Sequence, residues 1–238
     1  MSTDRTRLQS GQSLVEMMVV VLVLGLVLAT VTAAFLSVQR TSDEIDNRFE
    51  NTGEAQKLIA ALTKDVRTAT PLTAGTSPFL TGPGEGGADK RRMTFYGDLN
   101  FVTGATPRFP NKIDLLIDTT NPAAPVLKEF IWVPTNNNTL DAAPNYNATA
   151  TSLRLVGQYV ANAAIDPIFK YYDGSNPPVE LIPQTSPAVG LSLADQLKVR
   201  TVKIALSVRK QTSRAVQPVR VESTVRLSNV IYGNLTAS

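Results

Sequence analysis

The sequence predicts an α+β fold, in which one long N-terminal α-helix is followed by a C-terminal head rich in antiparallel β-strands. Three observations predict it. Residues 17–39 contain no charged side chain and are mostly aliphatic. Apolar residues then recur at helical spacing through residues 41–70. Beyond residue 71, several short segments alternate apolar and polar side chains, which is typical of strands that bury one face.

The uncharged run at residues 17–39 predicts a helix that spans a membrane. As an α-helix it is about 34 Å long, which is enough to cross a hydrocarbon core of about 30 Å. Its middle is apolar on every side, unlike a helix on the surface of a soluble protein. Arg5 and Arg7 precede the run, and Arg40 follows it. By the positive-inside rule, the two leading arginines predict a cytoplasmic N-terminus and an exported head.

A glutamate immediately precedes this uncharged run. Glu16 follows a short polar leader that ends at Gly11, and a charge at the edge of hydrocarbon is costly enough to indicate a function. An ordinary secretory signal places its apolar segment before the cleavage site. Here the glycine precedes the apolar segment, so cleavage beside it leaves the helix on the mature chain. The simplest alternative is a signal anchor in which Glu16 has no role.

The stretch Gly11-Gln-Ser-Leu-Val-Glu16 resembles the prepilin signature of type IV pilins and type II secretion pseudopilins. The resemblance implies that a prepilin peptidase cleaves between Gly11 and Gln12, and that Gln12 is then a candidate for N-methylation. It also implies that Glu16, the fifth residue of the mature chain, pairs with the Gln12 amine of a neighbouring subunit. The family usually has Phe at position 12, and an N-terminal Gln can cyclise and lose its charge.

Residues 41–70 are predicted to continue the same helix out of the membrane as a stem. Its apolar residues recur on one side, with charged residues around them, and they are Ile45, Phe49, Leu58, Ile59, Leu62 and Val66. Pro71 predicts the end of the helix, because the residue before a proline is disfavoured in the helical region. A helix that is apolar in one half and amphipathic in the other needs lipid or partner helices for the first half and a packed head for the second.

The head is predicted to hold seven strands. We expect them at residues 92–96, 113–118, 126–133, 153–159, 168–172, 202–208 and 219–227. The last two alternate most clearly, and residues 210–218 join them, so we expect an antiparallel hairpin with one wet face. A helical turn is expected at residues 192–196, and loops at residues 73–89 and 135–152.

The order of several of these segments is similar to that of the larger minor subunits, the J-type pseudopilins and minor pilins like them. The matching stretches are Leu62-Thr-Lys-Asp-Val-Arg67, Met93-Thr-Phe-Tyr96, Ile168-Phe-Lys-Tyr-Tyr-Asp173 and the last strand, residues 221–229. This similarity implies a minor subunit.

Composition argues against an enzyme. The chain has no cysteine and no histidine, which removes disulfides and the commonest general base and metal ligand. The net charge of +3 forms no basic run, so no nucleic-acid partner is indicated. No cofactor or metal is predicted. The glycine-rich residues 82–87 lack the Lys-Ser/Thr of a phosphate-binding loop, and residues 173–176 are expected to form a turn and not a calcium loop.

Two further groups of side chains are predicted to have structural roles. Asp114 and Asp118 stand four residues apart in one expected strand, and we expect them to lie along a solvated edge. The aromatic residues Phe130, Trp132, Tyr171 and Tyr172 are expected in the core.

The sequence therefore predicts a leader at residues 1–11, a transmembrane and assembly helix at 12–40, an amphipathic stem at 41–70 and a β-rich globular head at 71–238. The predicted function is that of a non-enzymatic minor pilin or pseudopilin of the inner membrane, later incorporated into a type IV pilus or type II secretion pseudopilus. Its expected partners are other pilin subunits, the prepilin peptidase, the assembly platform and membrane lipid. The alternatives are a major pilin and a signal-anchored extracellular module for adhesion or DNA binding.

Overall fold

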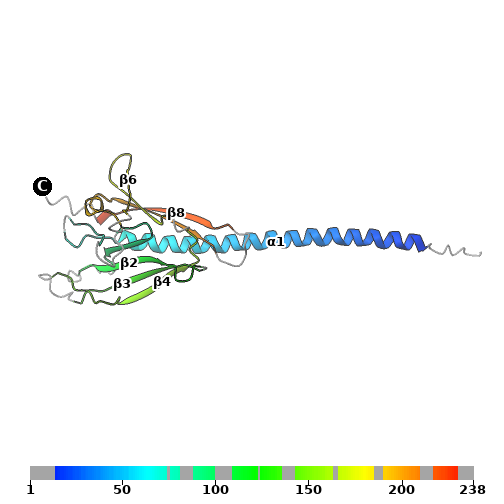
Figure 1. Cartoon of the computed structure of the whole chain (residues 1–238), viewed down its shortest axis with the longest axis horizontal. Coiled ribbons are helices and arrows are strands. Elements are labelled where there is room, and N and C mark those ends of the chain that lie inside the picture. Colours follow the sequence, from blue (N-terminus) through cyan, green and yellow to red (C-terminus); the bar gives the residue numbers. More distant parts are fainter. Residues whose placement is uncertain are drawn as a thin grey trace, which may run out of the picture. The chain divides into compact units, whose positions relative to one another are not determined.

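The computed structural model describes residues 14–73, 76–80, 88–99, 109–122, 124–135, 143–162, 166–184, 190–209 and 217–229. In chain order, its elements are α1 (Leu14–Arg67), β1 (Arg92–Gly97), β2 (Asn111–Asp118), β3 (Val126–Trp132), β4 (Ser152–Gln158), β5 (Phe169–Tyr172), β6 (Glu180–Leu181), α2 (Leu193–Gln196), β7 (Thr201–Val208) and β8 (Val219–Arg226). The long N-terminal helix and the antiparallel strands that follow it confirm the predicted α+β fold (Figure 1). The chain divides into two compact units, residues 1–46 and residues 47–238.

The first sheet has the strand order β1-β2-β3-β4, and all its pairs are antiparallel. Its inner face is apolar because the strands alternate with a period of two. Met93 lies opposite Leu115, and Phe95 lies opposite Ile113. These four side chains are completely buried, so this face forms one wall of the core.

The second sheet has the strand order β6-β5-β7-β8 and is also antiparallel. The predicted C-terminal hairpin is confirmed, with Val202 opposite Val225 and Leu206 opposite Val221. The buried face of β7 contains Val202, Ile204, Leu206 and Val208. The two-residue strand β6 was not predicted, because a segment so short carries no readable alternation.

The second half of α1 belongs to the core of the second unit. Its buried apolar side chains recur at helical spacing and are Ala55, Leu58, Ile59, Leu62 and Val66. Within this unit the first sheet lies along one side of α1 and the second sheet along the other (Figure 1). Thr63 marks the contact with the second sheet, since its hydroxyl donates a hydrogen bond to Ser223 Oγ at 3.1 Å. Phe49, which belongs to the predicted apolar stripe, is 74% exposed.

Helix α1 ends at Arg67, three residues before the end that Pro71 predicts, which is residue 70. After Arg67 the chain turns, and the Thr68 hydroxyl donates to the carbonyl oxygen of Asp65 at 2.7 Å. The Thr70 amide then donates to the carbonyl oxygen of Tyr96 at 2.9 Å. The helix therefore gives way to pairing with the edge of β1 before the proline is reached.

The prediction for Asp114 is wrong. Asp114 does not lie on a solvated edge, because β2 is an inner strand, and this side chain is only 2% exposed. It accepts hydrogen bonds from Arg92 Nε at 2.9 Å, Arg92 Nη2 at 2.7 Å and the Thr94 hydroxyl at 3.0 Å. Asp118 at the end of β2 is more open and pairs with Lys128 at 2.5 Å.

Of the four aromatic residues predicted in the core, only Tyr171 is completely buried. Phe130, Trp132 and Tyr172 are half-buried. Phe130 and Trp132 pack against each other with ring centroids 6.2 Å apart, and Lys112 Nζ lies 4.8 Å from the Trp132 ring. These two aromatic residues occupy the face of β3 that points away from the core, because the buried residues of the strand, Leu127 and Glu129, lie on the opposite face.

The predicted turn at residues 173–176 is present. Asp173 Oδ1 accepts hydrogen bonds from the Ser175 amide at 3.1 Å, the Ser175 hydroxyl at 2.6 Å and the Val179 amide at 2.9 Å. These bonds hold the pKa of Asp173 below its usual range. The carboxylate is thus used to close a turn, as Asp side chains commonly are. The glycine-rich residues 82–87 lie outside the described residues.

Candidate functional site: the N-terminal helix

Helix α1 begins at Leu14, and Glu16 lies in its first turn. The first four amide groups of a helix have no partner within the helix, and the positive end of the helix dipole favours a carboxylate there. Glu16 is therefore compatible with its place in the helix and exposed along its side. The predicted cleavage residues Gly11 and Gln12 lie outside the described residues, so the cleavage site and the Gln12–Glu16 pair stay predictions.

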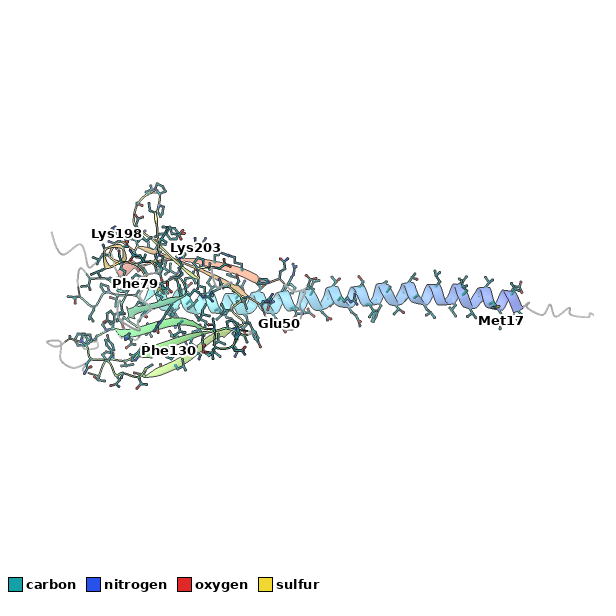
Figure 2. All side chains as sticks on the ribbon, viewed as in Figure 1. Met17, Glu50, Phe79, Phe130, Lys198 and Lys203 are labelled. Atoms are coloured by element: carbon teal, nitrogen blue, oxygen red, sulfur yellow. The ribbon has the colours of Figure 1, made fainter. Side chains whose placement is uncertain are left out.

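The first half of α1 presents an apolar surface that is exposed among the described residues. Every large apolar side chain from Leu14 to Val38 is between 45% and 76% exposed. The side chains project outward on all sides of the helix, as at Met17 (Figure 2). An apolar surface of this extent is unfavourable in water and indicates a contact with lipid or with other helices.

Both threonine hydroxyls of this segment are satisfied within the helix. The hydroxyl of Thr30 donates to the Val27 carbonyl oxygen at 2.8 Å, and that of Thr32 donates to the Leu28 carbonyl oxygen at 2.8 Å. Such bonds allow threonine to lie in hydrocarbon, where no water is present to pair with it. Among the described residues, α1 is the one helix long and apolar enough to cross a membrane, judged by length and composition.

The described surface of the head offers hollows but no metal site. One hollow of about 620 Å³ is lined by Arg91, Arg92, Leu116, Ile117, Thr119, Pro122, Pro125 and Asn162. Arg92 already forms a salt bridge with Asp114. The side-chain amide of Asn162 donates a hydrogen bond to one backbone carbonyl of β7 and accepts one from a backbone amide of the same strand. Within the described residues, no three His, Cys, Asp or Glu side chains are close enough together to hold a metal ion.

Sequence reasoning missed a buried cluster of charges in the second unit. Arg154 on β4 donates to Asp65 Oδ2 on α1 at 2.7 Å and to Glu129 Oε2 on β3 at 2.5 Å. Asp65 and Glu129 are 5% and 1% exposed, whereas the Arg154 side chain is 50% exposed. Burial raises the pKa of Asp65 from an ordinary value of 3.8 to about 6, and the negative charge of Glu129 adds to this rise.

A signal for this cluster is present in the sequence. Residues 55, 58, 62 and 65 are spaced by three or four and so share one face of a helix. Ala55, Leu58 and Leu62 are apolar, so Asp65 places a charge on a buried stripe. A charged residue on a buried stripe requires a partner, although the spacing alone does not identify that partner.

Comparison with known proteins bears on the N-terminal segment. Residues 6–32 match the family model described as the prokaryotic N-terminal methylation motif. The matched residues include the end of the predicted leader, Gly11, Glu16 and residues 17–32 of the apolar run. No curated protein matches the chain. The motif supports the resemblance to pilin-like proteins, which a prepilin peptidase processes and which serve a structural role.

Proposed function

We propose that this chain, which carries an N-terminal methylation motif, is a non-enzymatic minor pilin or pseudopilin that is incorporated into a type IV pilus or a type II secretion pseudopilus. One observation carries the proposal: the matched motif includes residues 14–32 of α1, whose large apolar side chains are exposed among the described residues. The other half of the same helix is packed in the head. The chain thus has one apolar half-helix that can pass from lipid to a bundle of neighbouring helices.

In this proposal the leader, residues 1–11, is removed by the prepilin peptidase, and Gln12 becomes the first residue of the mature chain. Before assembly the protein is a single-pass protein of the inner membrane, with a cytoplasmic N-terminus and an exported head. Its partners are the peptidase, the assembly platform, other pilin subunits and membrane lipid. Methylation of the Gln12 amine keeps its positive charge.

Glu16 supplies specificity in this mechanism. When the helix leaves lipid for the centre of a filament, an unpaired carboxylate there is penalised by several kcal/mol, about 3–5 in measured buried pairs. The Gln12 amine of a neighbouring subunit removes this penalty in one register only. The pair therefore selects the axial position of each subunit more than it adds net stability.

Incorporation into filaments is the test of this function. We would express the tagged full chain in cells that assemble a type IV pilus or pseudopilus, shear the filaments and measure the chain in the sheared fraction. We expect the wild type there in small amounts relative to the main subunit. A Gly11→Ala variant, in which the peptidase site is disturbed, should stay with the membrane. Equal amounts of the wild type and this variant in the sheared fraction would contradict the proposal, and so would a wild type confined to the membrane in its processed form.

A further inference from the structure

We propose that Asp65 and Glu129 share one proton, and that uptake of this proton tightens the packing of the second half of α1 against the first sheet. The inference concerns the second unit only, and it does not depend on leader cleavage or on incorporation into a filament.

The cluster carries more negative than positive charge. Two carboxylates, from α1 and β3, converge on the single guanidinium of Arg154 from β4. The charged groups that act on Asp65 are Glu129 and Arg154. Lys128, the neighbour of Glu129 along β3, pairs instead with Asp118. With both carboxylates ionised, the cluster holds a net charge of −1 in a site where the two acids are almost completely buried, which is unfavourable.

A proton between the two acids also supplies a hydrogen bond to a buried oxygen of Glu129. Glu129 Oε1 is buried and accepts no hydrogen bond from the described part of the chain. Its neighbour Oε2 is occupied by Arg154 Nε. Asp65 Oδ2 and Glu129 Oε2 accept from Nη2 and Nε of the same guanidinium, which brings the two carboxyl groups side by side. A protonated Asp65 has an O–H group that can donate to Glu129, and the cluster is then neutral with its acceptor satisfied.

The direction of the pH dependence follows from the pKa of Asp65. Folding raises this pKa from 3.8 to about 6, mainly through burial and then through Glu129. The folded state therefore binds the proton more tightly than the unfolded state, and stability from this group is fully present below pH 3.8. It is lost as the pH rises to about 6 and beyond. The second half of α1 is thus held more firmly at pH 5 than at pH 7.5.

The positions of Asp65 and Glu129 in the fold determine that the proton acts on the packing between α1 and the first sheet. Asp65 lies on α1 and Glu129 on β3, so repulsion between the two ionised carboxylates acts across the contact between the helix and the first sheet. On the neighbouring strand β4, Gly157 contacts Leu58 of α1. The repulsion therefore loosens the edge of the sheet that α1 packs against.

The experiment uses the full chain in detergent micelles. We would follow thermal unfolding of the β-rich unit by circular dichroism between pH 4.5 and 7.5, for the wild type, Asp65→Asn and Asp118→Asn. Asn at position 65 imitates the protonated acid, because its amide can donate to Glu129 while its oxygen accepts from Arg154. We expect the wild-type Tm to fall by several degrees as the pH rises through 6. The Asp65→Asn Tm should stay level, and the Asp118→Asn control should keep the wild-type slope.

A wild-type pH slope in Asp65→Asn overturns the proposal, and so does a wild-type Tm that rises between pH 5 and 7.5. If Asp65→Asn does not fold, Glu129→Gln answers the same question, since it also removes the excess negative charge and should flatten the slope. Infrared spectroscopy gives an independent readout: the difference between the spectra of the wild type and Asp65→Asn at pH 5 should contain the carbonyl band of one protonated carboxyl group. A difference spectrum without that band would exclude the shared proton.

Discussion

Gly157 on β4 lies directly against Leu58 on α1: a Cβ atom added to the glycine would stand 1.9 Å from Leu58 Cδ2. The contact joins an outer strand of the first sheet to the helix that anchors the chain. Leu58 is only 2% exposed, so it has little room to withdraw. The absence of a side chain at position 157 therefore sets how closely the sheet approaches the helix.

Gly157→Ala should destabilise the second unit by about 1–3 kcal/mol, the usual cost of an overpacked core. Denaturant unfolding of the full chain in micelles measures it. Leu58→Ala removes the atoms that the new methyl group meets, so the double variant should be less destabilised than the sum of the two single variants. Gly53→Ala is the matched control, because nothing lies within 4 Å of its added Cβ and helical propensity favours Ala. Strict additivity at positions 58 and 157 would refute the contact.

Asp114→Ala should be destabilising because it removes the buried carboxylate that accepts hydrogen bonds from Arg92 Nε, Arg92 Nη2 and the Thr94 hydroxyl. We expect a loss of about 1–3 kcal/mol in the free energy of unfolding. Asp118→Ala, in the same strand, provides the comparison: its pair with Lys128 is more exposed, so its effect should be small. Two variants of equal stability would mean that burial of Asp114 does not matter energetically.

A fragment that begins at residue 43 should melt cooperatively and at a higher temperature than a fragment that begins at residue 71. The reason is that Leu58, Leu62 and Val66 supply part of the core and are lost from the shorter fragment. Removing these side chains leaves the inner faces of both sheets in water. Calorimetry of the two fragments measures the difference. Equal melting temperatures would show that α1 contributes nothing to the stability of the head.

Glu16→Ala should impair assembly while membrane insertion and leader removal stay intact. The neutral side chain lowers the cost of placing the segment in hydrocarbon, so the variant should accumulate normally. Loss of a buried charge partner worth several kcal/mol predicts that co-purification with other pilin subunits falls by about tenfold or more. Undiminished recovery, with an uncyclised Gln12 confirmed by mass, would rule out the Gln12–Glu16 pair.

The sequence was sufficient to predict the α+β class, the continuous helix and the C-terminal hairpin, because periodicity reports directly on which residues share a face. Periodicity does not show what covers the other face of a strand. Asp114 was therefore placed on a solvated edge, although β1 and β3 flank its strand. Phe130 and Trp132 were placed in the core, although they lie on the far side of β3 from Leu127.

The charged cluster shows a different limit of sequence reasoning. Asp65, Glu129 and Arg154 come from three elements, and two of these residues are 89 positions apart in the chain. Asp65 interrupts a buried helical stripe, and Glu129 alternates with the buried Leu127, so each can be recognised as a charge in an apolar pattern. Only the pairing of β3 with β4 and the packing of α1 bring the three together.

The mass of the N-terminal peptide shows whether the proposed prepilin cleavage takes place. The full chain would be expressed in cells with an active prepilin peptidase, extracted from the membrane and digested. We expect a mature N-terminus at Gln12, with the leader, residues 1–11, absent and a further mass increment if Gln12 is methylated. A protein that retains Met1 and the intact leader in those cells, while a known prepilin beside it is cleaved, would rule out prepilin processing and favour a simple signal anchor.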